Sequence, residues 1–288
     1  MIIREEVSFF LSLVLSGLCL GALYAFVATG YSLIFGVLRF INFAHGEIFA
    51  VGAYAAYVVW RLGFSPPVLI LAGITVSAAI SCVVERFAYR PLSQGRTVLL
   101  LATSVGISVI IRSSLAILFG DSFVTIRPRG ETCYATLFHL RFACGQIYVL
   151  VVGATLTIVL WWLVQKTQIG RRIRAVASNR SAAESLGISK HAIHRNTFLL
   201  GGAYAGAAGA LAALITELTP QMGVFLGLKA FTAAIIGGVG SVFGAFAAGL
   251  LLGVFESLAT GYFGSQYQNT YVLLALVMFL LLRSRVGR

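Results

Sequence analysis

Few residues of this chain could do chemistry, and most of them are polar groups placed beside long apolar runs. Asn42, His45 and Glu47 stand together between two apolar segments. A His and a Glu two residues apart supply neither a nucleophile nor a third orienting group, so the cluster gives little support to catalysis. Two ligands are also too few for a metal centre when no Cys/His cluster accompanies them.

The same cluster is typical of a break between membrane helices. Unpaired polar groups are costly in hydrocarbon, so Asn42, His45 and Glu47 must be buried in protein or line a wet cavity. A helix that starts near Gly46 would point its free N–H groups at the break, which suits a carboxylate ligand or a hinge. The alternative is structural: Asn42 and His45 cap the helix, and Glu47 complements its dipole.

A second break follows Lys229, which lies in an apolar segment. The Gly-Gly-x-Gly run after it lacks the strand and helix context of a nucleotide-binding loop and therefore indicates an interrupted helix. Lys229 needs a partner such as Glu217 or Glu256, unless it reaches the membrane interface or steers a substrate carboxylate. The candidate residues for a substrate pathway or helix break are Asn42, His45, Gly46, Glu47, Lys229, Phe231, Thr232, Gly237, Gly238 and Gly240.

The elements that position these residues are membrane helices. Of the 288 residues 59% are hydrophobic and 10% are charged, whereas about a quarter of residues are charged in soluble domains. The composition predicts an all-α polytopic membrane protein with about eight or nine membrane segments, some of them short or broken. Seven full-length candidates are 8–36, 67–85, 97–119, 147–165, 196–218, 241–262 and 268–282. Two shorter, Gly-rich candidates are 46–60 and 223–239.

The positive charges predict an orientation. Of the 21 Lys and Arg residues, 13 fall in the ranges 86–96, 166–195 and 283–288, which places all three ranges in the cytoplasm by the positive-inside rule. Since the net charge of +12 is explained in this way, nucleic-acid binding is disfavoured. The loop at about 120–146 is then outside the cytoplasm. In an oxidising compartment Cys133 and Cys144 could form a disulfide there, and the alternative is that both stay free. The N-terminus is also outside if both short segments cross.

The cytoplasmic loop 166–195 carries a helical pattern. Apolar residues recur at helical spacing from Gly170 to Ala177. Ser181 and Glu184 have the spacing of a capping box, and Gly187 suits a left-handed helix end. The pattern predicts a short capped helix that docks on a partner, while the alternative is a solvated loop on anionic lipid head groups.

Five pairs of glycines have the GxxxG spacing, which allows helix backbones to approach closely. Packing within the chain is the favoured interpretation, and a subunit interface is the alternative. The pairs are Gly17/Gly21, Gly202/Gly206, Gly223/Gly227, Gly240/Gly244 and Gly249/Gly253.

Several runs together resemble the LivH-type permeases of branched-chain amino acid ABC transporters, a group with urea and amide relatives. The matching runs are GLCLGALYA at 17–25, INFAHGE at 41–47, Gly170-Arg171 through Ala182-Ala183 to Gly187-Ile188, GLKAF at 227–231 and GGVGS at 237–241. The resemblance implies a second, LivM-like permease, two cytoplasmic ATPase subunits and a periplasmic binding protein as partners. It also implies that the stretch from Ala182 to Gly187 docks on an ATPase. Ser181 stands where many ABC permeases have Glu. The candidate docking residues are Gly170, Arg171, Arg172, Arg174, Ser181, Ala182, Ala183, Glu184 and Gly187.

The expected function is therefore that of a transport subunit in a single membrane domain, 1–288. It would be a multi-pass protein of the bacterial inner membrane with a cytoplasmic C-terminus, passing branched-chain or other hydrophobic amino acids inward. The sequence has no G-x-x-x-x-G-K-[ST] phosphate loop, so we expect ATP on partner subunits and no cofactor on this chain. A urea or short-amide permease is the alternative. An ion-coupled transporter or channel would need more carboxylates within its spans.

Overall fold

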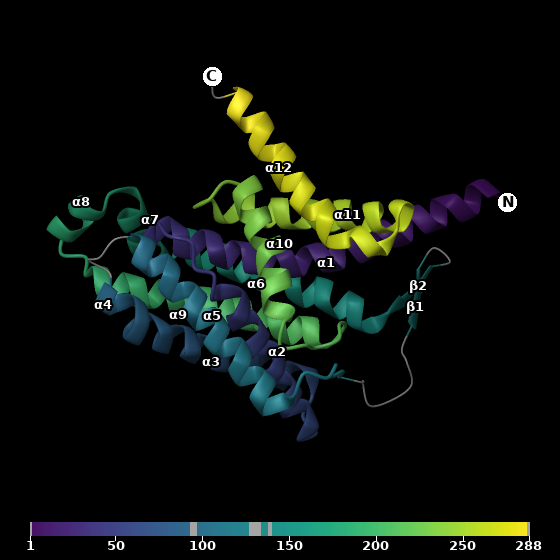
Figure 1. Cartoon of the computed structure of the whole chain (residues 1–288), viewed down its shortest axis with the longest axis horizontal. Helices are drawn as coiled ribbons and strands as arrows, with labels where there is room; N and C mark the ends of the chain where they lie inside the picture. The colour runs from purple at the N-terminus through teal and green to yellow at the C-terminus, as the bar shows by residue number, and fades with distance from the viewer. Residues whose placement is uncertain (1, 93–96, 127–133, 138–139, 287–288) are drawn as a thin grey trace.

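The structure, a computed structural model, describes residues 2–92, 97–126, 134–137 and 140–286. Long helices form most of it (Figure 1). The long helices are α1 (Ile2–Leu38), α2 (His45–Arg61), α3 (Pro66–Val84), α5 (Thr97–Phe119), α6 (Cys144–Lys166), α9 (Lys190–Ala213), α10 (Met222–Ile236), α11 (Val242–Phe263) and α12 (Gln268–Val286). The shorter elements are a π-helix (Glu85–Tyr89), α4 (Arg90–Leu92), β1 (Tyr134–Leu137), β2 (Leu140–Ala143), α7 (Gln168–Ser178), α8 (Arg180–Ser185) and a 3-10 turn (Ser265–Tyr267).

The helices confirm the predicted all-α class, and each predicted segment corresponds to one of them. Six of the described helical segments are long and apolar enough to cross a membrane. They cover most or all of α1, α3, α5, α6, α11 and α12. The antiparallel hairpin of β1 and β2 is an addition that lies within the predicted outer loop. The proposed Cys133–Cys144 pairing concerns side chains outside the described part of the chain.

Glycines set the distances between the most closely packed helices. A Cβ atom on Gly253 of α11 would lie 2.2 Å from the Cα atom of Gly21 on α1, so the two backbones touch directly. Gly206 of α9 likewise faces the carbonyl oxygen of Gly73 on α3, at 2.1 Å from its hypothetical Cβ. Such contacts confirm packing within the chain for four GxxxG pairs. Gly240 and Gly244 also pack within the chain, against Gly36 and Gly237, but Gly240 lies in the turn before α11, so this pair does not form a helix–helix contact.

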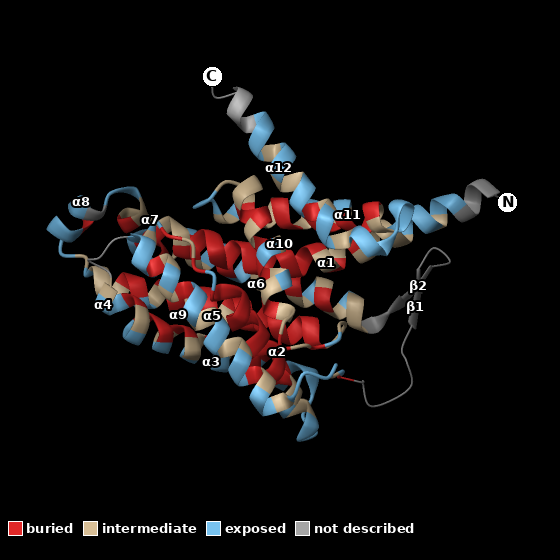
Figure 2. Cartoon of the chain, in the orientation of Figure 1, coloured by how far each residue is buried: buried red, intermediate tan, exposed pale blue. Residues whose placement is uncertain are grey.

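The two ends of the bundle differ. In Figure 1, α4, α7 and α8 lie at one end, and the N-terminus and the β1–β2 hairpin lie at the other. The basic segments around 86–92 and 166–195 therefore share an end, as the charge pattern requires; residues 93–96 lie outside the described ranges. α12 leaves the bundle, and Figure 2 shows that most of its described surface is exposed or half-buried.

Candidate functional site

The predicted break lies between α1 and α2 and is held by Asn42. The backbone N–H of His45 donates to the carbonyl oxygen of Asn42 at 3.0 Å, and the N–H of Ala44 donates to Asn42 Oδ1 at 3.2 Å. The same Oδ1 accepts from the Tyr89 hydroxyl at 2.6 Å, and Tyr89 is supplied by the π-helix. π-Helical turns often occur at functional sites. Asn42 thus satisfies the backbone before α2, which starts at His45, one residue before the predicted start.

His45 and Glu47 are buried in protein, as the cost of polar groups in hydrocarbon requires. The imidazole ring of His45 is 0% exposed and meets the Tyr31 ring edge-on, with centroids 4.8 Å apart. Glu47 is 1% exposed, and its Oε1 accepts from the Ser108 hydroxyl of α5 at 3.2 Å. Among the described residues no group of three His, Cys, Asp or Glu lies close enough together to hold a metal ion.

The start of α2 crosses α10 at glycines. A Cβ atom on Gly46 would lie 2.3 Å from the carbonyl oxygen of Gly223 and 2.9 Å from the Cα atom of Gly227. The two helices can approach this closely only because none of the three residues has a side chain. This contact brings the first predicted break against the segment that carries the second.

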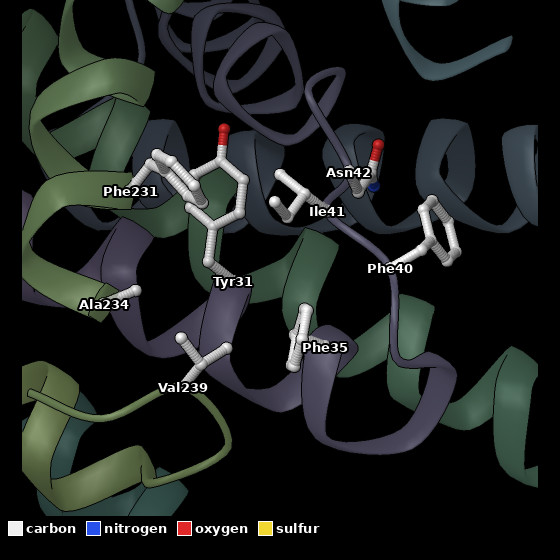
Figure 3. Close-up of a pocket in the computed structure, with 8 residues that line it drawn as sticks. All are labelled: Tyr31, Phe35, Phe40, Ile41, Asn42, Phe231, Ala234 and Val239. Atoms are coloured by element: carbon white, nitrogen blue, oxygen red, sulfur yellow. The ribbon is translucent and has the colours of Figure 1, made fainter. Parts of the chain in front are cut away.

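A small pocket lies where the break, α1 and α10 meet. It is lined by Tyr31 and Phe35 of α1, Phe40, Ile41 and Asn42 of the break, Phe231 and Ala234 of α10, and Val239 of the turn after α10 (Figure 3). The walls are mostly apolar, and the Nδ2 of Asn42 has no hydrogen-bond partner among the described residues. The pocket has a volume of about 10 Å³, which suits about one water molecule, so the pocket is closed to larger ligands in this conformation.

Lys229 faces away from the pocket, toward α11. Its Nζ lies 2.6 Å from Glu256 Oε1, and the side chains of Lys229 and Glu256 are 11% and 0% exposed. The same carboxylate oxygen accepts from the Tyr24 hydroxyl at 3.1 Å and from Gln268 Nε2 at 2.5 Å. The prediction that Lys229 has an acidic partner is confirmed, and the partner is Glu256. The other candidate, Glu217, is exposed. This buried pair and its two neutral donors tie α1, α10, α11 and α12 together.

The remaining residues of the second break shape the turn between α10 and α11. Thr232 donates its hydroxyl to the Leu228 carbonyl at 2.9 Å, within its own helix. Gly238 and Gly240 have φ values of 90° and 93°, in the left-handed region that glycine tolerates. The N–H of Gly240 donates to Ser32 Oγ at 2.9 Å. The predicted helix interruption is therefore confirmed, and the turn is anchored to α1.

The basic loop folds into α7 and α8. α7 buries Gly170, Ile173 and Val176, and Thr167 caps its start by accepting from the Gly170 N–H at 3.2 Å. Arg174 turns inward: its Nη1 donates to the Val164 carbonyl, and its Nη2 donates to the Gln165 carbonyl at 3.2 Å. Arg174 thereby caps the end of α6.

The predicted capping box of α8 was wrong, although the helix and its end were predicted correctly. Asn179 is the cap, accepting from the Ala182 N–H at 3.1 Å, and Ser181 lies inside the helix. Gly187 has φ +78°, its N–H donates to the Glu184 carbonyl, and the Ile188 N–H donates to the Ala183 carbonyl. Ala183 is buried, Ser181, Ala182 and Glu184 are exposed, and Leu186 beyond them is 81% exposed.

Known proteins resemble this chain over nearly its whole length. The family described as branched-chain amino acid transport system, permease component, matches residues 13–282. The chain belongs to this family. The high-affinity branched-chain amino acid transport system permease protein BraD of Pseudomonas aeruginosa is 33% identical over 96% of this chain and 95% of its own length. The corresponding LivH protein of Escherichia coli is 29% identical over 99% of this chain and 97% of its own length.

Two solved structures share the fold of this branched-chain amino acid permease family member. An inward-facing metal-chelate type ABC transporter has a TM-score of 0.52 and 15% identity over 96% of this chain and 85% of its own. PsaBC from Streptococcus pneumoniae has a TM-score of 0.51 and 13% identity over 93% and 89%. The family member is thus a multi-pass membrane protein and a permease component, not an enzyme. As a permease component of a transport system, it works with other subunits.

Sequence reasoning on this permease missed several residues that complete the site. Tyr24 and Tyr31 are seven residues apart on α1, a spacing that puts both on one helix face and could have pointed to them. Tyr89, Ser108 and Arg39 gave no such signal, because each meets its partner through a contact distant in sequence.

Proposed function

We propose that this chain passes branched-chain or other hydrophobic amino acids inward across the bacterial inner membrane, as the permease subunit of a binding-protein-dependent ABC importer. The family match over residues 13–282 carries this proposal. The names of the relatives favour it over the urea or short-amide alternative. The whole chain, 1–288, acts as one membrane domain, and its basic segments and C-terminus face the cytoplasm.

The pocket at the break supports an apolar substrate. Phe35, Ile41, Phe231 and Val239 would contact an aliphatic side chain. Because the lining side chains leave almost no free volume in the pocket in this conformation, an amino acid can pass only if α1, the break or α10 moves. The turn at Gly237, Gly238 and Gly240 and the break at 42–47 are where the helices can bend.

The α7–α8 segment is the proposed contact with the ATPase. Arg171, Arg172 and Leu186 are exposed on it. Leu186 is an apolar side chain on a polar, basic segment, and an apolar groove of a partner would bury it. Docking on anionic lipid, which the arginines would also allow, is the outcome that the ATPase co-purification test below distinguishes.

The proposed assembly contains this chain, a second LivM-like permease, two cytoplasmic ATPase subunits and a periplasmic binding protein in a lipid bilayer. ATP binds the ATPase subunits, and this chain needs no cofactor of its own. Reconstitution of these components in vesicles tests the function. Leucine with its binding protein should stimulate ATP hydrolysis and accumulate inside, whereas urea and acetamide should do neither. Stimulation by urea alone would overturn the substrate proposal.

The docking contact has a separate test. Leu186→Glu should abolish co-purification of the ATPase subunits while membrane levels stay unchanged. Phe64→Ala and Phe64→Glu are matched controls, since Phe64 is an exposed apolar residue in the turn between α2 and α3. Arg171→Glu with Arg172→Glu should weaken the same contact. Arg174 is left intact in this variant, because its contacts hold α6 and α7 together. Full ATPase binding by Leu186→Glu would contradict the docking proposal.

A further inference from the structure

Arg39 joins the end of α1 to the end of α7. Its Nη2 donates to the carbonyl oxygen of Ala177 at 2.8 Å, across 138 residues of sequence. Ala177 lies in the last turn of α7, where carbonyl groups lack helical partners and carry partial negative charge. The guanidinium group therefore caps α7 from another helix, with both the charge and the hydrogen bond favourable.

The backbone of Arg39 points to the same contact. Among the described residues, Arg39 is the one non-glycine residue with a positive φ, at 59°. Its N–H donates to the Phe35 carbonyl at 2.8 Å, so Arg39 ends α1 in a left-handed turn. Glycine adopts this conformation without an energetic penalty, whereas any L-residue adopts it at a cost. The cost of placing a side chain there is offset by what that side chain binds, which is the end of α7.

The residues next to Arg39 form the pocket wall. Phe35 lies one turn before it, and Phe40, Ile41 and Asn42 follow directly. On the other side, Asn179 both ends α7 and caps α8. A short path therefore runs from α8 through Asn179 and α7 to Arg39 and the pocket.

We propose that Arg39 is a positioning residue that couples movement of the α7–α8 segment to the wall of the pocket. The inference rests on the proposed function, in which α7 and α8 touch the ATPase. When the ATPase subunits move α8, α7 moves with it and pulls on the left-handed turn at Arg39. That turn then shifts residues 40–42 and opens or closes the pocket.

The test uses the complete reconstituted transporter and the ratio of ATP hydrolysis with and without loaded binding protein. Arg39→Ala should lower this ratio about fivefold while co-purification of the ATPase subunits stays normal. Arg39→Lys, which keeps the cation, should recover most of it. Arg39→Gly relieves the backbone but removes the guanidinium group, and it should lose as much as Arg39→Ala. Arg61→Ala, which removes another exposed arginine at a helix end, is the matched control.

Each other outcome overturns the proposal. A wild-type ratio in Arg39→Ala would mean that the contact with Ala177 is not used for coupling. A normal ratio in Arg39→Gly beside a low one in Arg39→Ala would mean that backbone strain alone matters. Should Arg39→Ala fail to accumulate, Arg39→Met, which keeps the aliphatic part of the side chain without any N–H donor or charge, carries the same test with the same expected loss. The docking proposal fails separately, through ATPase co-purification with Leu186→Glu.

Discussion

Replacement of Lys229 by Met tests how the buried ion pair holds the bundle. In the native protein Glu256 Oε1 accepts from Lys229, Tyr24 and Gln268, and the Glu256 side chain is 0% exposed. Without Lys229, two neutral donors remain for a fully buried carboxylate. Water cannot reach this group to compensate for the lost cation.

The expected loss follows from this burial. Removal of one partner of a buried pair costs about 3–5 kcal/mol in stability. Loss of a single hydrogen bond to a charged group, as in Tyr24→Phe, costs about 1.5–3 kcal/mol. For a chain of this size, about 1 kcal/mol corresponds to about 2–4 °C in Tm. We therefore expect Lys229→Met to lower Tm by about 6–20 °C, and Tyr24→Phe by about 3–12 °C, with Lys229→Met the more destabilising of the two.

The double variant Lys229→Met with Glu256→Met removes both charges at similar volume. It should recover most of the loss, because no uncompensated charge remains. The assay is thermal unfolding in detergent, followed by the fluorescence of Trp60, Trp161 and Trp162. Transport by the double variant then separates the two roles considered for Lys229. Uptake at the wild-type rate would exclude Lys229 from binding the substrate carboxylate.

Two results would refute the reasoning. If Lys229→Met lowers Tm no more than Tyr24→Phe, the charge of Glu256 is not compensated by Lys229. If the double variant is as unstable as Lys229→Met, the loss comes from packing and not from an unpaired carboxylate.

Three further predictions concern the crossing of α2 and α10, the cap of α8 and the pocket. Gly46→Ala should lower stability by about 1–3 kcal/mol, because the added Cβ forces α2 away from α10. Gly106→Ala, where a Cβ meets nothing within 4 Å, is the control and should raise stability by about 0.5–1 kcal/mol. Equal Tm values for the two variants would contradict the close crossing of α2 and α10. Asn179→Ala should lower stability by about 1 kcal/mol and speed hydrogen exchange at 180–186. Ser181→Ala should change stability by less than about 0.5 kcal/mol. A larger loss in Ser181→Ala than in Asn179→Ala would support the capping box of Ser181 and Glu184 instead. Val239→Trp should fill the pocket and stop uptake while Val239→Ala retains it, and rapid uptake by Val239→Trp would place the pathway elsewhere.

The helices were predictable because a membrane span is recorded in consecutive residues. The predicted segment 97–119 coincides with α5, and the two short segments became α2 and α10. The cost of polar groups in hydrocarbon likewise predicted that Asn42, His45 and Glu47 are buried. Each of these predictions uses local sequence alone.

The rest depends on contacts that local sequence does not encode. Asn179 and Ser181 are both good capping residues, and only the turn between α7 and α8 selects Asn179. Glu217 and Glu256 were equal candidates for Lys229 until the helices were placed. Leu186 reads as an ordinary apolar residue in sequence, and its exposure appears only when α8 is folded.

The glycine contacts have a consequence for how this chain responds to random mutation. At Gly21, Gly46 and Gly253 the neighbouring atoms belong to another backbone, which cannot rotate away as a side chain can. A buried Leu or Val has room to exchange for a similar residue, but these positions accept no added atom without moving a whole helix. A saturation scan scored only for membrane insertion and folding would therefore identify the positions at which helices contact each other. The positions that tolerate no substitution would reveal which helices are neighbours, without any measurement of transport.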